Sequence, residues 1–256
     1  MSRTVMQRLR IFIIAVIVFE LAPPAHAQQL NIVDNLAGFF TDISASTPLV
    51  LGNDEELVVG TTIGNIVFPA GSVVVANNGG MAFRNPPTTD LAPANEPIPS
   101  MAAFGGGQAL LVYWDDFDDK DGDVFLSQET GDLIIQWHNR LLGGAATGTA
   151  RVQLKIFGNV GPSGIVAQLI FDDIQQPGVE GGVGATIGYQ DGGAGFGDVQ
   201  WSFNTAGAVA NGTVLSLVLT DSVPATSEWT LVILLIGLLV AGTVIFHRRT
   251  RDTQRT

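Results

Sequence analysis

The sequence contains no cysteine and three histidines among its 256 residues. Without cysteine there is no disulfide framework, no thiolate nucleophile and no cysteine zinc site. Any stability must therefore come from an apolar core. Only His138 lies between residues 28 and 222, and a single histidine does not make the usual histidine-rich zinc site.

Positive charge is also scarce in the central region. Residues 28–222 hold five basic and 21 acidic residues, a balance of −16, whereas the whole chain carries −12 because seven further basic residues lie at its ends. Such a surface repels nucleic acid and anionic lipid. Nucleic acid is therefore excluded as a partner, and the excess of negative charge favours solubility and attracts cations.

The first 27 residues have the pattern of a secretory signal peptide. Three arginines lie within the first ten residues, an apolar stretch covers residues 11–19, and Ala25-His26-Ala27 provides a small-residue cleavage site. We expect cleavage after Ala27 and a mature chain that begins at Gln28. The alternative is an uncleaved N-terminal anchor.

The other end of the chain has the pattern of a membrane span. Residues 229–246 contain no charged residue, and about two-thirds of them are Leu, Ile, Val or Phe. A helix of this length just crosses the hydrocarbon layer of a bilayer. Arg248 and Arg249 follow the span, and such a basic flank stays in the cytoplasm as a stop signal. We expect a single transmembrane helix that leaves residues 28–222 outside the cytoplasm.

A short motif precedes this span, formed by Val223, Pro224, Ser227, Glu228 and Trp229. A proline-containing motif that ends in Ser-Glu-Trp, followed by a hydrophobic span and an arginine cluster, resembles the C-terminal sorting signals of the PEP-CTERM type. The IPTL-CTERM variant is the most similar, although Ala-Thr stands here in place of its Thr-Leu and Pro-Glu-Pro is absent. The resemblance covers residues 223–256. It implies a Gram-negative envelope protein processed or retained by an exosortase-like membrane enzyme, and a plain single-pass anchor is the alternative.

The central region has the pattern of strands and turns. Short β-branched or aromatic segments are separated by Gly, Asn, Asp and Pro. Residues 63–68 and 72–76 are two of the expected strands, and Asn77-Asn78-Gly79-Gly80 predicts a tight turn. Residues 84–107 form a long loop rich in Pro and Gly. About a dozen strands at this spacing predict an all-β fold, a two-layer antiparallel β-sandwich.

The order of several segments resembles the nidogen-type extracellular β-domain of secreted bacterial proteins. A Trp-Asp-Asp strand is followed by an Ile-x-x-Trp-x-Asn strand, an Ile-Phe-Asp-Asp segment, an Ile-Gly strand and a Trp-Ser-Phe strand. The corresponding residues are 113–117, 131–139, 170–173, 185–190 and 199–204, with 75–79 matching a turn upstream. The resemblance implies a fold but little about function. Residues 84–107 depart from the compact version of that domain.

Residues 115–123 are the densest cluster of charge, with six carboxylates in nine positions. They repel one another unless something offsets the charge. Hard oxygen ligands on a glycine-containing turn suit Ca²⁺, and Asp119, Asp121 and Asp123 would be the first ligands.

The EF-hand spacing is not met, because Phe117 and Gln128 fall at the first and last ligand positions when Gly122 is placed sixth. The alternative is a solvated turn in which Asp115 or Asp116 caps backbone amides. A second acidic turn at 54–56 could share a site with it.

A catalytic role has little support in the sequence. The sequence contains no Gly-x-Ser-x-Gly nucleophile elbow that could act with His138. We therefore expect that the protein is not an enzyme. Five aromatic residues could stack on a sugar, but alternating strands favour their burial in the core: Tyr113, Trp114, Trp137, Tyr189 and Trp201.

The sequence favours an envelope protein that displays a β-sandwich for adhesion or for surface or biofilm-matrix structure. It would be tethered to a membrane or sorted, with extracellular polysaccharide or other surface proteins as partners. The alternative is a Ca²⁺- or carbohydrate-binding module that uses the acidic turn. An extracellular hydrolase is the third hypothesis.

Overall fold

The computed structural model describes residues 28–34, 38–83, 90–128, 131–141, 149–161, 163–174, 182 and 184–221, together with Ile236 and Leu239. Within it, Gln28–Thr220 form a compact unit. The expected signal peptide, the sorting motif at 223–229 and the arginines at 248 and 249 lie outside the described residues. Among the described residues, no helix is both long and apolar enough to span a membrane.

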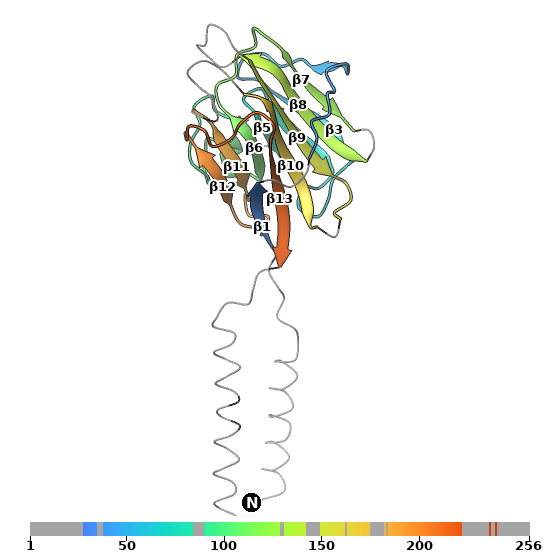
Figure 1. The fold of residues 1–256 in the computed structure, drawn as a ribbon, viewed down its shortest axis with the longest axis vertical. Helices are drawn as coiled ribbons and strands as arrows, with labels where there is room; N and C mark the ends of the chain where they lie inside the picture. Colours follow the sequence, from blue (N-terminus) through green and yellow to red (C-terminus); the bar gives the residue numbers. More distant parts are fainter. Residues whose placement is uncertain are drawn as a thin grey trace, which may run out of the picture. The chain divides into compact units, whose positions relative to one another are not determined.

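The described residues contain thirteen strands in two antiparallel sheets (Figure 1). Sheet A has the order β1 (Gln28–Asp34), β13 (Thr213–Asp221), β10 (Ile165–Asp173), β9 (Thr149–Phe157), β8 (Asp132–Leu141), β7 (Asp123–Ser127) and β2 (Pro48–Leu49). Sheet B has the order β12 (Val199–Phe203), β11 (Thr186–Gln190), β6 (Ala109–Trp114), β5 (Gly80–Ala82), β4 (Gly71–Ala76) and β3 (Glu56–Thr61). A short 3₁₀ helix, η1, covers Phe104–Gly106. The predicted all-β class is confirmed, and the two antiparallel sheets are consistent with a β-sandwich.

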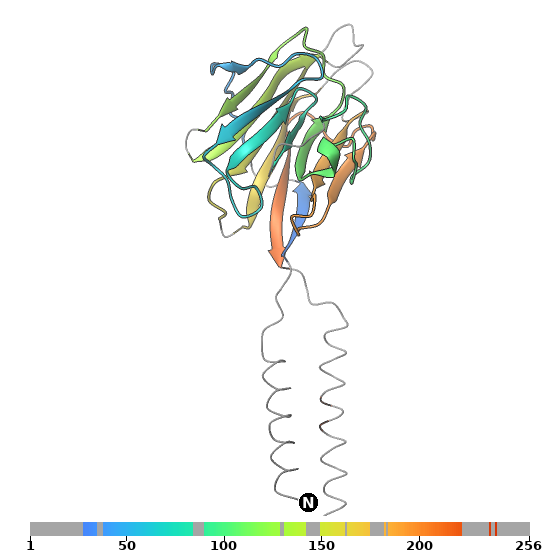
Figure 2. The same cartoon turned by 180° about the vertical axis from the view of Figure 1, so that it is seen from behind.

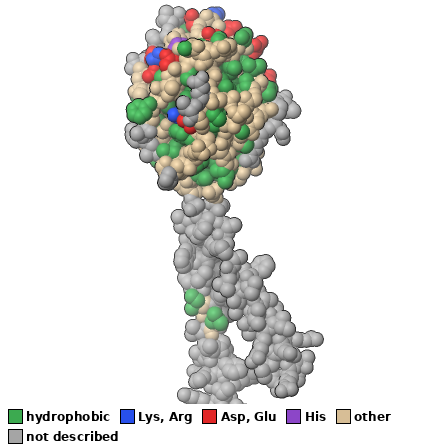
Figure 3. Space-filling model, turned by 90° about the vertical axis from the view of Figure 1, so that its right-hand side faces the viewer, with side chains coloured by type: hydrophobic (Ala, Val, Ile, Leu, Met, Phe, Trp, Pro, Cys, Tyr) green, Lys and Arg blue, Asp and Glu red, His purple; other side chains and the backbone are tan. Residues whose placement is uncertain are grey.

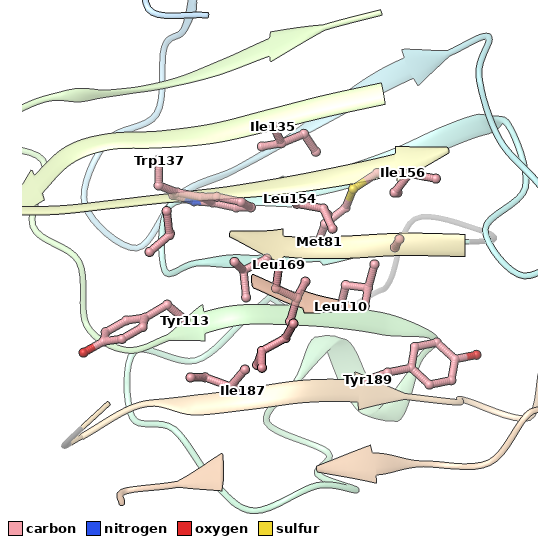
Figure 4. Packing of buried hydrophobic residues seen from close by; sticks show 14 of the residues in the cluster. Met81, Leu110, Tyr113, Ile135, Trp137, Leu154, Ile156, Leu169, Ile187 and Tyr189 are labelled. Carbon is pink, nitrogen blue, oxygen red and sulfur yellow. The ribbon is translucent and has the colours of Figure 1, made fainter. Parts of the chain in front are cut away.

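The core lies between the inner faces of the two sheets (Figure 4). Its residues follow the strand period of two, so that Ile135 and Trp137 of β8 are fully buried. Trp137 also donates its indole N–H to the carbonyl oxygen of Ala76 at 2.9 Å, which ties β8 to the opposite sheet. Each fully buried large apolar side chain contributes about 1.5–3 kcal/mol. A core of this extent explains how the chain manages without disulfides.

The strand expected at residues 63–68 is absent from the structure. Residues 62–70 form bends and irregular chain instead, and the strand that pairs with β4 is β3. The cause is Asn65, whose side-chain oxygen accepts the N–H groups of Val67 and Phe68 at 3.0 and 2.9 Å. An asparagine that binds the main chain two residues later makes a turn, and the turn competes with a strand.

A segment that belongs to no strand crosses the outer face of sheet A. This strap, residues 38–46, is bound through its main chain by two glutamines that are neighbours across β8 and β9. Gln153 accepts from Thr41 N at 3.1 Å and donates to Thr41 O at 2.7 Å. Gln136 accepts from Ile43 N at 2.9 Å. Both glutamines are fully buried, so the outer face of sheet A is closed by the chain itself at this point.

A second segment, the cover (residues 90–107), lies over strands β4, β5 and β6 on the outer face of sheet B, and Figure 2 shows the domain from behind. Its apolar residues pack on the outward side chains of β4, β5 and β6, including the fully buried Trp114. Gln190 of β11 accepts from Ser100 N at 2.6 Å and donates to Gly107 O at 2.9 Å. The expected loop at 84–107 is therefore, over its described residues, an ordered layer.

The two ends of the compact unit meet. Thr220 donates its hydroxyl to Gln29 O at 3.2 Å and accepts from the side chain of Asn31 at 2.8 Å. Because each strand from β13 to β7 is antiparallel to its neighbour, β7 begins at the end of sheet A opposite to the end where β13 finishes. The connection at 115–122, which leads into β7, therefore lies at the far end of the domain from Gln29 and Thr220.

The turn at 77–80 requires a glycine at position 79, and this requirement can be tested. The φ of Gly79 is +80°, and a Cβ at this position would lie 2.1 Å from the carbonyl oxygen of Tyr113. We predict that Gly79→Ala lowers the free energy of unfolding by about 3 kcal/mol or more in urea denaturation. Gly207→Ala is the matched control, because its φ is +69° but nothing lies within 4 Å of the added Cβ. It should cost about 1 kcal/mol, and equal losses for the two variants would refute the close contact.

Candidate functional site: the acidic end

Three connections meet at the end of the domain that is far from the chain termini. They are residues 50–55, 77–79 and 115–122, and together they form what we call the acidic end. Figure 3 shows the red carboxylate side chains gathered toward this end. The structure therefore brings the two predicted acidic turns, 54–56 and 115–123, to the same region of the surface.

Two buried asparagines hold the three connections together. Asn77 donates its amide N–H to Glu55 O at 2.9 Å and its side-chain N–H to Phe117 O at 2.5 Å. Asn78 donates to an Asp54 carboxylate oxygen at 3.0 Å and accepts from Phe117 N at 3.1 Å. Both are at most 1% exposed. The predicted Asn-Asn-Gly turn is thus present, but it lies beneath the acidic residues instead of at the surface.

Arg140 is the residue that offsets the charge of the turn, and sequence reasoning missed it. Strict alternation along β8 would place it away from the interior. The register between β8 and β9 shifts between Trp137 and Arg140, with Asn139 at φ +52°, and this irregularity turns Arg140 inward. Arg140 is 2% exposed, and its guanidinium donates to Gly122 O at 2.8 Å and to the side-chain oxygen of Asn77.

The electrostatics around Arg140 follow from this position. Burial lowers its pKa below the ordinary value, while Asp123, Asp119 and Asp118 act in the opposite direction. The guanidinium nevertheless stays charged, because an arginine side chain does not lose its proton in folded proteins. The acidic turn is thus folded around a buried positive charge, and this charge reduces the repulsion expected among its six carboxylates.

The predicted Ca²⁺ ligands do not converge. Asp119, Asp121 and Asp123 are all exposed, and nowhere in the part of the chain that the structure describes do three or more Asp, Glu or His side chains form a group that could hold a metal ion. The alternative expected Asp115 or Asp116 to cap backbone amides, and Asp115 does so, because its carboxylate accepts from Asp116 N at 2.9 Å. Asp118 pairs with Lys120 within the turn.

Asp115 is the most unusual carboxyl of the turn. Burial raises its pKa to about 7, against a smaller lowering by the hydrogen bond from Asp116 N. Burial also raises the pKa of Asp116, and Asp54 and Asp118 raise it further. Asp115 can therefore take up a proton near neutral pH. Such perturbed groups occur at functional sites and also in structural networks.

The aromatic residues considered for sugar stacking are placed mainly in the interior. Tyr113, Trp114, Trp137 and Tyr189 are at most 1% exposed, whereas Trp201 is partly buried against the core. The core role predicted for most of them is confirmed. His138 lies on the outward side of β8, where its Nδ1 is 2.7 Å from the side-chain nitrogen of Gln136 and its ring is in a T-shaped arrangement with the ring of Phe125.

The account of Arg140 predicts a large effect of removing its charge. Arg140→Met should lower the free energy of unfolding by about 3 kcal/mol, because Asn77 and Gly122 lose charge-assisted hydrogen bonds in a buried place. Arg151→Met provides the control, since Arg151 forms a partly exposed ion pair with Asp172 and should cost at most about 1 kcal/mol. Guanidinium denaturation measures both, and a small loss for Arg140→Met would contradict the role assigned to it.

The raised pKa of Asp115 predicts how the stability of the fold depends on pH. Its folded pKa is raised, so the folded state binds the proton more tightly than the unfolded state, and stability falls as the pH rises from about 4 through about 7. Asp115→Asn keeps the acceptor for Asp116 N and cannot ionise. At pH 8 this variant should be more stable than the wild type by on the order of 2 kcal/mol.

Thermal unfolding between pH 4 and pH 8 tests this prediction. Asp121→Asn serves as the control, because Asp121 is exposed and its replacement should leave the pH profile unchanged. Identical profiles for Asp115→Asn and the wild type would show that Asp115 is not the group that titrates.

Comparison with known proteins does not assign the chain to a family. No family model matches the chain, and no curated protein or solved structure matches it. The resemblances to a sorting signal and to a nidogen-type domain therefore stay predictions. What the acidic end does is argued from its own residues.

Proposed function

We propose that the chain is an exported protein of a Gram-negative cell envelope, tethered to a membrane or sorted through residues 223–256, and that it displays its β-sandwich for adhesion or for surface or biofilm-matrix structure. It carries out no catalysis. The hydrophobic segments at both ends of the sequence and the acidic, strand-built region between them motivate this proposal.

One structural observation supports it above the others. Gln29 and Thr220 are joined by a hydrogen bond, so the chain enters and leaves the compact unit at one end. The acidic end lies opposite. A protein held through the residues that follow Thr220 would thus present the acidic end as the part farthest from its point of attachment.

The covered sheet faces support a display role as well. Strap and cover occupy parts of the outer faces of sheets A and B, and the large aromatic residues are mostly buried. The surface left for partners includes the acidic end, with carboxylates at 54–56 and 115–123. Partners that bring positive charge, including matrix polymers or surface proteins bridged by cations, fit this surface by simple electrostatics.

Single cysteines placed in the cysteine-free chain test the proposed topology. Asp121→Cys puts a thiol at the exposed acidic end, and Thr253→Cys puts one after the predicted span. A maleimide that cannot cross the cytoplasmic membrane should label Asp121→Cys in cells whose outer membrane is permeabilised. It should label Thr253→Cys only after lysis, and mass spectrometry of that variant shows whether the tail has been removed.

Two results would overturn the proposal. The first is protection of Asp121→Cys until the cytoplasmic membrane is broken, which would place the domain in the cytoplasm. The second is labelling of Thr253→Cys from outside, which would reverse the orientation. The wild-type protein serves as the blank. It should take up no maleimide, because its sequence has no thiol.

A further inference from the structure

We propose that His138 makes the strap sensitive to acid. While the imidazole of His138 is neutral it helps to hold the strap on sheet A, and this hold is lost when the imidazole takes up a proton. His138 lies on β8 beside Gln136, the glutamine that binds Ile43 of the strap. The sensitivity is a property of the fold and does not depend on the proposed cellular role.

The main chain of the strap fixes which way round the amide of Gln136 lies. The oxygen of this amide accepts the main-chain N–H of Ile43 at 2.9 Å and a side-chain N–H of Gln153 at 3.2 Å. Gln153 is itself oriented, because its oxygen accepts from Thr41 N and its nitrogen donates to Thr41 O. A main-chain N–H can only donate and a carbonyl oxygen can only accept. The nitrogen of Gln136 therefore lies on the opposite side of the amide.

The side-chain nitrogen of Gln136 has two N–H groups and two neighbours. One neighbour is a carboxylate oxygen of Asp42 at 3.0 Å, and the other is Nδ1 of His138 at 2.7 Å. The carboxylate accepts one N–H, so the second N–H points at Nδ1, which must accept it. His138 therefore carries its proton on Nε2 and is neutral while the strap is closed. Gln136 is fully buried, so water does not replace this contact.

A proton on Nδ1 would bring two donors face to face. Both ring nitrogens donate in an imidazolium, so the contact between His138 and Gln136 would turn from attraction into repulsion. While the strap is in place, the amide of Gln136 cannot turn over, because its oxygen binds Ile43 N. Once the strap has left, the amide is free to turn its oxygen toward the imidazolium. The open state thus binds the proton more tightly than the closed state, and acid favours opening.

Three charged groups face His138 from the elements packed against it. Asp42 of the strap attracts the imidazolium only in the closed state, which opposes opening. The hydrogen bond from Gln136 is the main cause that lowers the pKa of Asp42, and the charge of His138 has the smallest influence on it. Asp123 lies opposite His138 on β7, and Arg151 lies opposite the irregularity that follows Trp137 on β8. Both belong to sheet A in either state, so neither reverses the effect.

Opening of the strap would uncover an apolar part of sheet A. Ile43 packs with Phe125 of β7 and Ile134 of β8 in a small cluster on the outer face of the sheet. Histidine side chains change charge between about pH 5 and pH 8. A fall in pH across this range would therefore make an apolar patch accessible that the strap otherwise closes.

Amide hydrogen exchange of the full-length protein in detergent micelles, followed by mass spectrometry between pH 5 and pH 8, measures this opening. Protection factors, corrected for intrinsic rates, should be about tenfold lower at pH 5 than at pH 8 for residues 39–46, which is the effect of losing about one hydrogen bond. Protection of residues 152–156, at the centre of β9, should not fall on acidification.

Two variants separate His138 from the other acidic and basic groups. His138→Asn places an amide oxygen near the position of Nδ1, so it accepts from Gln136 but takes up no proton. The protection of its strap should be the same at pH 5 and pH 8. Asp42→Asn is the matched control, because it keeps an oxygen for Gln136 and removes the one titratable side chain of residues 38–46. It should retain the fall in protection and enlarge it, since the opposing charge is gone.

Nitrogen-15 NMR of the imidazole, with the signals of His138 identified by their loss in His138→Asn, gives a second readout. At pH 8 the proton should be on Nε2. A proton on Nδ1 would overturn the proposal, because it would leave no acceptor for Gln136. Three exchange results would do the same: a wild-type strap whose protection does not fall between pH 8 and pH 5, a His138→Asn strap that falls as the wild type does, or an Asp42→Asn strap that no longer falls.

Discussion

The main chain of a segment that crosses a sheet face outside any ladder must find hydrogen-bond partners, because a buried and unpaired amide costs more than most contacts return. In this protein, glutamine side chains provide those partners on both sheets. Gln136 and Gln153 bind the strap, and Gln190 binds the cover. An amide side chain suits this task since it donates and accepts at once, as the main chain of a neighbouring strand would. The strap and the cover can therefore be ordered without being strands.

This closure of the outer faces bears on what the domain can do. A sheet face covered by its own chain is not free to bind a partner, and the buried aromatic residues offer no stacking platform. The exposed carboxylates of the acidic end remain, supported from beneath by Arg140 and the two asparagines. Burial raises the pKa of Glu56, because the acidic connections are packed against one another and are not spread over a solvated surface.

Much of the architecture could be predicted from the sequence, and the failures have physical causes. Strand alternation placed Trp137 and its neighbours in the core, and the Asn-Gly signal predicted the turn after β4 correctly. The strand expected at 63–68 does not form, because the side chain of Asn65 binds the main chain two and three residues later. Arg140 was missed because a register shift in β8 reverses its direction, and no local pattern announces such a shift. The acidic residues were found by composition, but their support by Asn77 and Asn78 is a contact between segments distant in the sequence.

The central claim is that side-chain amides hold the strap and the cover as firmly as strands are held. Hydrogen exchange by NMR at pH 6 tests it most directly, at the main-chain amides of Thr41, Ile43, Ile98 and Ser100, each of which donates to a glutamine side chain although none lies in a strand. The account predicts that these amides exchange at least about a hundredfold more slowly than the unstructured chain. Exchange of all four at the rate of an open loop would contradict it.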